Sequence, residues 1–169
     1  MKLPPFQIKM YGPNALLLEW PKEVAPDILM DILSFEEYLR ENHLRGDSWE
    51  FVPIYHSLTL INRTGDAEMV GIARSLPDWY TSCPKHNPSN ARRWELPVCY
   101  EDPYGLDLED TARKLKMTPE NLVALHSGRD YRVYGIGFLP GFLYLGDIPD
   151  ALKIPRREQP RLRVPRGSV

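Results

Sequence analysis

The stretch from Gly137 to Gly146, with the sequence GFLPGFLYLG, combines residue types that shape a small-molecule pocket. Glycine lets the backbone approach a ligand closely and adopt positive φ, whereas proline fixes φ and removes an N–H donor. Aromatic side chains on such a bend supply rigid apolar walls. The candidate pocket positions are Gly137, Phe138, Pro140, Gly141 and Phe142. A tight turn between two strands explains the same residues equally well, because loops carry both turns and sites.

A cationic segment follows this bend. Residues 153–169 contain six basic side chains and one acidic side chain, a net charge of +5, so the rest of this chain of net charge −2 carries −7. A basic end on an acidic body predicts a local anion site or a docking surface. Guanidinium groups bind carboxylates and phosphates in a bidentate manner, which makes Arg156, Arg161 and Arg163 candidate ligands for an anion. Solvated arginines are the alternative. We expect the bend and the cationic segment to form a single cavity.

Few side chains in this region can transfer protons. Histidine can serve as an acid or a base, which makes His126 a candidate general acid or base, although a histidine at a helix end often only bonds terminal carbonyls. Ser168 is a candidate for orienting a phosphate or a water, and backbone N–H groups around Gly137, Gly141 and Gly167 are candidate oxyanion donors. The sequence has no Gly-x-x-x-x-Gly-Lys phosphate loop, so a nucleotide would be held in another way or largely by a partner.

Composition describes an ordinary globular protein. The chain has 169 residues, 43% hydrophobic and 26% charged, which suits one domain or two small ones. Two cysteines cannot form a disulfide framework, and Cys83-Pro84-Lys85-His86 lacks a partner pair at zinc spacing, so we expect no metal site. The sequence begins without a recognisable secretory signal, and its apolar runs are all much shorter than the roughly 20 residues of a membrane helix. We therefore expect a cytoplasmic protein without a membrane partner.

Hydrophobic periodicity predicts the elements that position these residues. In chain order we expect strands over 6–10 and 15–20, a helix from Pro26, strands over 49–54 and 57–61, a helix capped by Asp66 that bends or stops at Pro77, and a strand over 94–99. After an opening hairpin arm, this order is typical of a ferredoxin-like α+β unit. The Pro-, Asn- and Ser-rich residues 81–92 predict a linker or surface loop.

Two short helices and a further strand are expected next. Asp107 can cap the first helix, and Thr118-Pro119-Glu120 is a typical start of the second. Gly128 suits a left-handed cap at the end of the second helix, and residues 131–136 then predict a strand that leads into the bend.

Several linked motifs resemble the allophanate hydrolase subunit 1 family, which contains carboxyltransferase subdomains C and D and includes the B subunit of 5-oxoprolinase and the sporulation histidine-kinase inhibitor Kip. The motifs are Leu96-Pro97-Val98-Cys99-Tyr100, Asp107-Leu108, His126-Ser127, Tyr131-Arg132-Val133, GFLPGFLYLG, Pro155-Arg156-Arg157, Pro160-Arg161 and Val164-Pro165-Arg166-Gly167-Ser168-Val169. The resemblance covers most of the chain and is strongest from about residue 95 onward.

The resemblance implies an N-terminal ferredoxin-like α/β sandwich, which we place at residues 1–92, and a cyclophilin-like β-barrel that begins in residues 93–169. Relatives continue for several more strands, so the resemblance implies an incomplete barrel in a chain shortened at its C-terminus or completed by a partner. Arg166 and Asp147 depart from the family pattern, because relatives often have a small residue and a glycine there.

The resemblance also implies a function. The chain is expected to be a subunit of an ATP-dependent 5-oxoprolinase, which opens 5-oxo-L-proline to L-glutamate, or of an allophanate-hydrolase-like amide-cleaving complex. ATP with Mg²⁺ would be bound jointly with a partner, and the partners would be the companion A and C subunits of 5-oxoprolinase. His126 would be catalytic, and the bend, Arg156, Arg161, Gly167 and Ser168 would bind substrate or phosphate.

Two other functions compete with this one. The first is a non-catalytic binding module that inhibits a sensor histidine kinase, as the resemblance to Kip allows. The second is a basic-tailed nucleic-acid binder, whose affinity would fall steeply with salt. We rank it last and expect no nucleic-acid partner, because the arginines come without a matching fold motif.

Overall fold

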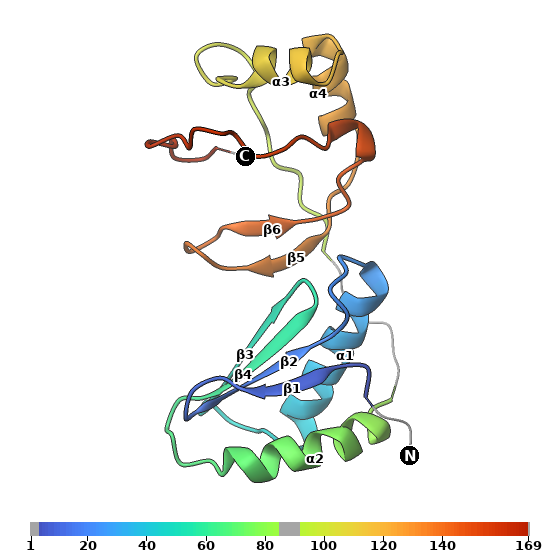
Figure 1. The fold of residues 1–169 in the computed structure, drawn as a ribbon, viewed down its shortest axis with the longest axis vertical. Helices are drawn as coiled ribbons and strands as arrows, with labels where there is room; N and C mark the ends of the chain where they lie inside the picture. Colours follow the sequence, from blue (N-terminus) through green and yellow to red (C-terminus); the bar gives the residue numbers. More distant parts are fainter. Residues whose placement is uncertain (1–3, 85–91, 169) are drawn as a thin grey trace. The chain divides into compact units, whose positions relative to one another are not determined.

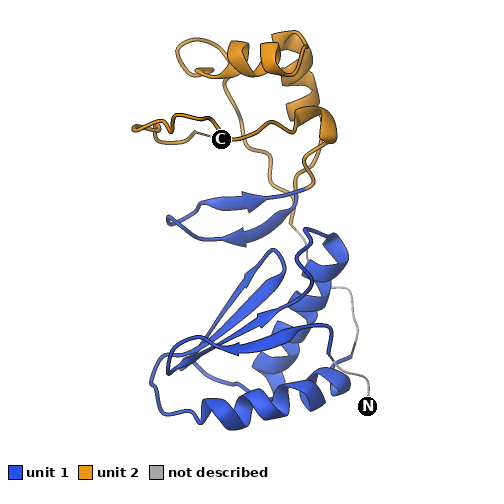
Figure 2. Cartoon of the chain, in the orientation of Figure 1, with its two compact units in different colours: residues 1–91, 132–146 blue, residues 92–131, 147–169 orange. Residues whose placement is uncertain are grey.

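The computed structural model describes residues 4–84 and 92–168. The chain divides into two compact units (Figure 2). Unit 1 comprises residues 1–91 and 132–146, and unit 2 comprises residues 92–131 and 147–169. Each unit therefore takes up two separate stretches of the chain.

A four-stranded antiparallel sheet forms the body of unit 1 (Figure 1). Its strands are β1 (Gln7–Met10), β2 (Ala15–Glu19), β3 (Trp49–Ile54) and β4 (Ser57–Asn62), in the order β1-β2-β4-β3. The register places Leu16 opposite Leu60 and Leu18 opposite Leu58. Since side chains alternate between the faces of a strand, this register gathers all four leucines on one face, where they are fully buried.

Two helices, α1 (Pro26–Asn42) and α2 (Met69–Ser82), pack their apolar sides into the same core. Helix α1 begins with Pro26 at its first position, as predicted, because its missing N–H would have no helical partner there. The buried core of unit 1 consists of Phe6, Leu16, Leu18, Trp20, Ile32, Phe35, Leu39, Leu44, Phe51, Leu58, Leu60, Met69 and Leu76. Burial of this layer between helices and sheet stabilises the unit.

The α+β class is therefore confirmed, but the expected strand over residues 94–99 is wrong, since these residues join no sheet among the described parts of the chain. Trp94 and Leu96 are 75% and 62% exposed, and Pro97 has no N–H for a strand ladder. In the expected strand order, a strand after α2 would complete the sheet beside β2. Here β1, from the opening hairpin, takes that edge position.

Helix α2 differs from expectation at both ends. Glu68 caps it by accepting a hydrogen bond from the Gly71 N–H, so the predicted cap at Asp66 is wrong. The helix continues through Pro77 to Ser82, because Leu76 is fully buried and the following turn packs on the core, which outweighs the lost backbone hydrogen bond. The predicted linker thus begins inside this helix, and its residues 85–91 lie outside the described residues.

A second, two-stranded sheet in unit 1 contains β5 (Val133–Ile136) and β6 (Leu143–Leu145). The strand predicted over residues 131–136 is confirmed, starting at Val133. The hairpin is attached to the turn between β3 and β4, where the Tyr55 N–H donates to the Tyr134 carbonyl at 3.0 Å. The Tyr134 ring, only 1% exposed, stacks on the Tyr55 ring with centroids 5.7 Å apart.

Unit 2 contains α3 (Leu108–Lys114), α4 (Pro119–Ser127) and the short 3-10 helix η1 (Asp150–Leu152). Thr118 caps α4 as predicted, by accepting from the Asn121 N–H at 3.3 Å. Gly128 has φ −81°, so the expected left-handed cap is wrong. Residues 153–168 contain neither helix nor strand.

The described residues form no β-barrel, which corrects the expected second domain. A barrel needs strands that pair on both sides, whereas the strands of the described chain form only an open four-stranded sheet and a two-stranded hairpin. In the cationic segment, Pro155, Pro160 and Pro165 remove backbone donors at regular intervals, which disfavours pairing there. Within residues 4–84 and 92–168, no helix has both the length and the apolar character needed to cross a membrane.

Candidate functional site

The bend at residues 137–142 is the connection of the β5–β6 hairpin, so its interpretation as a turn between two strands is correct. The Gly137 N–H donates to the Phe142 carbonyl at 3.1 Å, and the Phe142 N–H donates to the Leu139 carbonyl at 3.0 Å. Phe138 and Gly141 adopt φ of 61° and 81°, the left-handed region that glycine tolerates and phenylalanine rarely adopts. Because the hairpin uses the Gly137 N–H, that group is not an oxyanion donor in this conformation.

The side chains of the bend are exposed. Phe138 is 82% and Phe142 is 45% exposed, and their rings meet edge to face at 5.8 Å. A series of ring contacts continues from Phe142 to Tyr144 at 5.1 Å and from Tyr144 to Tyr55 at 5.8 Å. Aromatic pairs at these separations are mutually attractive. The tip of the hairpin is therefore an exposed apolar surface whose rings pack on Tyr144 and, through it, on Tyr55.

Two glycines allow the hairpin to lie close to the rest of unit 1. A Cβ at Gly146 would overlap the buried Tyr134 ring, because it would lie 2.6 Å from the Cδ2 of that ring. The same Cβ would lie 3.2 Å from the Cγ1 of Val24. A Cβ at Gly135 would overlap Ile54. The predicted pocket glycines of this region were Gly137 and Gly141, whereas Gly135 and Gly146 are packing residues.

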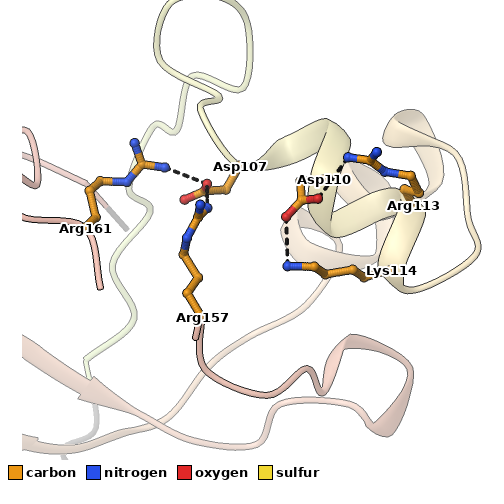
Figure 3. A network of polar contacts seen from close by, with 6 residues as sticks. All are labelled: Asp107, Asp110, Arg113, Lys114, Arg157 and Arg161. Atoms are coloured by element: carbon orange, nitrogen blue, oxygen red, sulfur yellow. Dashed lines mark hydrogen bonds and ion pairs between the residues drawn. The ribbon is translucent and has the colours of Figure 1, made fainter. Parts of the chain in front are cut away.

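The cationic segment forms an ion-pair cluster with Asp107 (Figure 3). The Arg161 Nη2 donates to the Asp107 Oδ1 at 2.6 Å, and the Arg157 Nη1 donates to the same oxygen. Asp107 stands at the cap position before α3, as predicted, but its side chain makes no capping hydrogen bond. We call these three residues the Asp107 cluster. It shows that this segment of unit 2 can hold an oxyanion between two guanidinium groups.

Arg157 was not among the predicted ligands, although it adjoins Arg156 in the sequence. The ion pairs of the cluster come from Arg157 and Arg161 (Figure 3). A pair of arginines in an irregular segment has no periodicity, so the sequence does not indicate which one faces the aspartate.

A second carboxylate, Asp110, has its own cations (Figure 3). Arg113 and Lys114 lie 2.9 and 2.8 Å from its oxygens and come from the next turn of the same helix. The hydrogen bond from Lys114 and the charges of Lys114, Arg113 and Arg157 lower the pKa of Asp110 below its usual value. Such neighbouring pairs are ordinary features of a helix surface.

His126 lies between two tyrosines of unit 2. The Tyr100 hydroxyl is 2.6 Å from the His126 Nδ1, and the Tyr131 hydroxyl donates to the His126 carbonyl at 3.0 Å. Burial raises the pKa of both Tyr100 and Tyr131, so both hydroxyls stay protonated at neutral pH. The Tyr100 hydroxyl occupies Nδ1 as a hydrogen-bond partner, so proton exchange between His126 and a ligand would use Nε2. Both tyrosines belong to the sequence motifs described above, but the motifs alone do not indicate a role for either side chain.

Ser168 and Gly167 lie in a turn at the end of the cationic segment. The Ser168 hydroxyl donates to the Pro165 carbonyl at 2.8 Å, and its N–H lies 3.3 Å from the same oxygen. Gly167 has φ 81°, which this turn requires. In this conformation the serine hydroxyl closes a turn.

The predicted site residues divide between the two units. Gly137, Phe138, Pro140, Gly141 and Phe142 belong to unit 1, whereas His126, Arg156, Arg161, Gly167 and Ser168 belong to unit 2. Within unit 2, the structure pairs Arg161 with Arg157 around Asp107 and pairs His126 with tyrosines. The single cavity expected from the bend and the cationic segment stays a prediction. In the described ranges, no group of three or more His, Cys, Asp or Glu side chains could hold a metal ion.

Comparison with known proteins extends over nearly the whole chain. The family model of the carboxyltransferase domain, subdomain C and D, matches residues 6–169. The B subunit of 5-oxoprolinase from Bacillus subtilis (strain 168) is 27% identical over an alignment of 174 positions. The alignment covers 97% of this chain and 72% of that protein. The B subunit of 5-oxoprolinase from Escherichia coli O157:H7 is 37% identical over 120 residues, which is 71% of this chain and 55% of that protein.

A solved structure has a similar fold. The crystal structure of TTHA0988 in space group P212121 matches with a TM-score of 0.72 at 30% sequence identity and covers 89% of this chain. The match is 29% of the TTHA0988 chain. The chain thus spans less than a third of that protein and about half of the Escherichia coli relative.

Proposed function

The chain belongs to the carboxyltransferase subdomain C and D family, and we propose that it is the B-type subunit of an ATP-dependent 5-oxoprolinase or of an allophanate-hydrolase-like amide-cleaving complex. The observation that supports this proposal most strongly is the similarity to the B subunit of 5-oxoprolinase along 97% of the chain. The reaction would open 5-oxo-L-proline to L-glutamate, together with the companion A and C subunits.

The cationic segment is the part of the chain best suited to hold a negatively charged reactant. Opening an unstrained lactam with ATP requires an activated carbonyl and fixed positive charge near the phosphates. The Asp107 cluster already holds a carboxylate oxygen between two guanidinium groups, which supports anion binding by Arg161. Arg156, exposed on the same segment, would contact the substrate or phosphate as well. Mg²⁺-ATP would supply the phosphoryl group and would be bound jointly with a partner.

His126 is the proposed acid or base of this subunit. The hydrogen bond between the Tyr100 hydroxyl and Nδ1 fixes the orientation of the ring and leaves Nε2 to exchange a proton with substrate or water. Glutamine at this position keeps a polar side chain but cannot titrate. Loss of activity in His126→Gln, with the subunit complex intact, is therefore the expected result of a proton-transfer role.

The bend of unit 1 and the turn at Gly167 and Ser168 in unit 2 are the other segments proposed to bind substrate or phosphate. In the bend, Phe138, Pro140 and Phe142 would contact an apolar part of a ligand, and backbone groups near Gly137 and Gly141 would face an oxygen after rearrangement of that turn. In unit 2, Gly167 and Ser168 would contact phosphate after rearrangement of their own turn. We also propose the domain boundary after residue 92.

The test is 5-oxoproline-dependent ATP hydrolysis by a purified complex of this chain with the companion A and C subunits. We expect activity that requires all three components and that falls by about a hundredfold in Arg161→Gln, since one lost charge contact to a reacting phosphate costs about 2–3 kcal/mol. The matched control replaces this chain by its Bacillus subtilis relative in the same complex. Activity with the control and none with this chain would contradict the proposal.

A second candidate function is a binding module that inhibits a sensor histidine kinase. The exposed apolar tip around Phe138 and Phe142 favours it, since large exposed apolar side chains often mark protein contacts. This function predicts direct binding of the chain to a kinase dimerisation domain, weakened by Phe138→Ser. Absence of binding at high micromolar concentration in a titration calorimetry experiment would reject it.

A further inference from the structure

We propose that Arg157 and Arg161 form an anion-binding site that Asp107 occupies as an internal competitor, and that a carboxylate or phosphate group binds by displacing the Asp107 side chain. The inference rests on the proposed function at one point, which is that Arg161 contacts a substrate or phosphate. It adds Arg157 to the site and gives Asp107 the role of regulating its occupancy.

Convergence of the two arginines on one atom is the first reason. Both guanidinium groups donate to the same oxygen, Asp107 Oδ1, although they come from positions 50 and 54 residues further along the chain. Two guanidinium groups repel each other at such a point unless an anion lies between them. The position of Oδ1 therefore marks where an oxygen of a bound carboxylate or phosphate would lie.

The aspartate can leave without losing all its partners, which is the second reason. Asp107 occupies the cap position of α3 but makes no capping hydrogen bond while it pairs with the arginines. Aspartate is among the preferred residues at that position, because its carboxylate accepts the first N–H groups of the helix. The Asp107 backbone has φ −112° and ψ 2°, so a shift toward the extended conformation of a capping residue, together with rotation of the side chain, would exchange the arginines for these donors. The two cations would then be left to the incoming anion.

Exposure of the cluster makes the exchange accessible from solvent. The side chain of Asp107 is 46% exposed, and those of Arg157 and Arg161 are 50% and 32% exposed. Ion pairs at this level of exposure are weak, so a ligand with more than one oxygen can compete with a single aspartate. A fully buried pair would resist such exchange.

Asp110 provides a matched control in the same helix. The two cations that pair with Asp110 are Arg113 and Lys114, which lie three and four residues further along α3. When the Asp110 charge is removed, these cations remain as two separate side chains on the helix surface. Asp107→Asn and Asp110→Asn remove the same charge within three residues of each other. Only the first variant removes the negative charge from the point between Arg157 and Arg161, so that an anion can displace the remaining neutral side chain.

The experiment measures anion binding to the full chain alone by titration calorimetry at low ionic strength, with pyrophosphate and 5-oxo-L-proline as separate probes. Asp107→Asn, which keeps a good cap residue, should bind one probe about three- to tenfold more tightly than the wild type. Asp110→Asn should gain clearly less than Asp107→Asn, because Asp110 acts on Arg157 only through its charge and makes no direct ion pair with either arginine of the cluster. Arg161→Gln or Arg157→Gln added to Asp107→Asn should abolish the gain.

The two probes distinguish the source of the anion. A gain with pyrophosphate assigns the site to a phosphate, and a gain with 5-oxo-L-proline assigns it to the substrate carboxylate. No gain with either probe, or an equal gain in Asp110→Asn, overturns the inference. If circular dichroism shows that Asp107→Asn is unfolded, Asp107→Ser replaces it with another cap residue. Since no companion subunit takes part, this result is independent of whether the complex hydrolyses ATP.

Discussion

Asp31 is a single carboxylate that joins three elements of unit 1. Its oxygens accept hydrogen bonds from the Trp20 Nε1–H at 2.8 Å and from the Tyr80 hydroxyl at 2.7 and 2.9 Å. Trp20 follows β2, Asp31 lies in α1 and Tyr80 lies in α2. The Tyr80 ring also packs edge to face on Phe35 at 5.1 Å, so the polar contact and the aromatic core support each other.

We expect Asp31→Ala to lower the free energy of unfolding by roughly 2–3 kcal/mol, because it leaves two partly buried donors without their shared acceptor. Urea denaturation followed by tryptophan fluorescence measures the change. Glu41→Ala, an exposed acidic residue on the same helix, is the control and should change stability by less than about 0.5 kcal/mol. Equal effects of the two substitutions would mean that Asp31 contributes only a surface charge.

Tyr80 makes stability depend on alkaline pH. Burial, followed by the hydrogen bond and charge of Asp31, raises the pKa of Tyr80 well above its ordinary value of 10.0. The folded protein therefore keeps this proton where the unfolded chain loses it, so the contribution is complete below pH 10 and declines as pH rises beyond it. We expect Tyr80→Phe to show a shallower fall of unfolding free energy between about pH 10 and 11.5, measured by urea titration at each pH. The same slope in both proteins would contradict this assignment.

At the scale of elements, the β5–β6 hairpin carries the most distinctive segment of the chain and depends on glycine for its attachment. Gly146 lies against the buried Tyr134 ring, whereas a Cβ at Gly137 would meet only the Tyr144 Cε2 at an ordinary 3.7 Å. The two positions belong to the same motif in the sequence but have different physical roles: one permits close packing and the other lies at the start of the bend.

We expect Gly146→Ala to destabilise unit 1 by about 1–3 kcal/mol, because the added methyl group must displace a buried ring. Gly137→Ala, the matched control, should stay within about 1 kcal/mol of the wild type. Thermal unfolding followed by the near-ultraviolet circular dichroism of the tyrosines reports both changes. A neutral Gly146→Ala variant would show that the hairpin is not packed closely on Tyr134.

At the scale of the whole molecule, the two units differ in how much apolar surface they bury. The core of unit 1 has thirteen buried side chains, whereas Ala112 and Leu122 are the buried apolar residues among the described part of unit 2. Several large apolar side chains of unit 2 are exposed, among them Trp94, Tyr104 and Leu162. A unit with so small a core opens at low cost in free energy.

We therefore expect amide hydrogens of α3 and α4 to exchange roughly a hundredfold faster than those of β2 and β4. Hydrogen exchange followed by mass spectrometry of peptides from each unit measures the ratio. Equal protection in both units would contradict it. In the proposed complex, added companion subunits should slow exchange in unit 2 more than in unit 1.

Much of unit 1 could be predicted because its signals are local. A continuous apolar run defines β2, alternating apolar residues define β4, Pro26 marks the start of α1, and the Tyr55-His56 pair separates β3 from β4. The turn in the Gly137–Gly146 motif also follows from the preferences of its own residues. The family resemblance came from the same linear motifs, and the match over residues 6–169 confirms it.

Other features required the tertiary structure, because they depend on residues that the chain brings together from a distance. β1 rather than residues 94–99 completes the edge of the sheet, and burial of Leu76 carries α2 past Pro77. The two partners of Asp107 are 50 and 54 residues away, and nothing in the sequence around Asp107 distinguishes it from a simple helix cap. Local preferences indicate where turns and helix ends can form. Strand pairing and burial decide which of these possibilities is realised, and they act between residues that are brought together only in the folded chain.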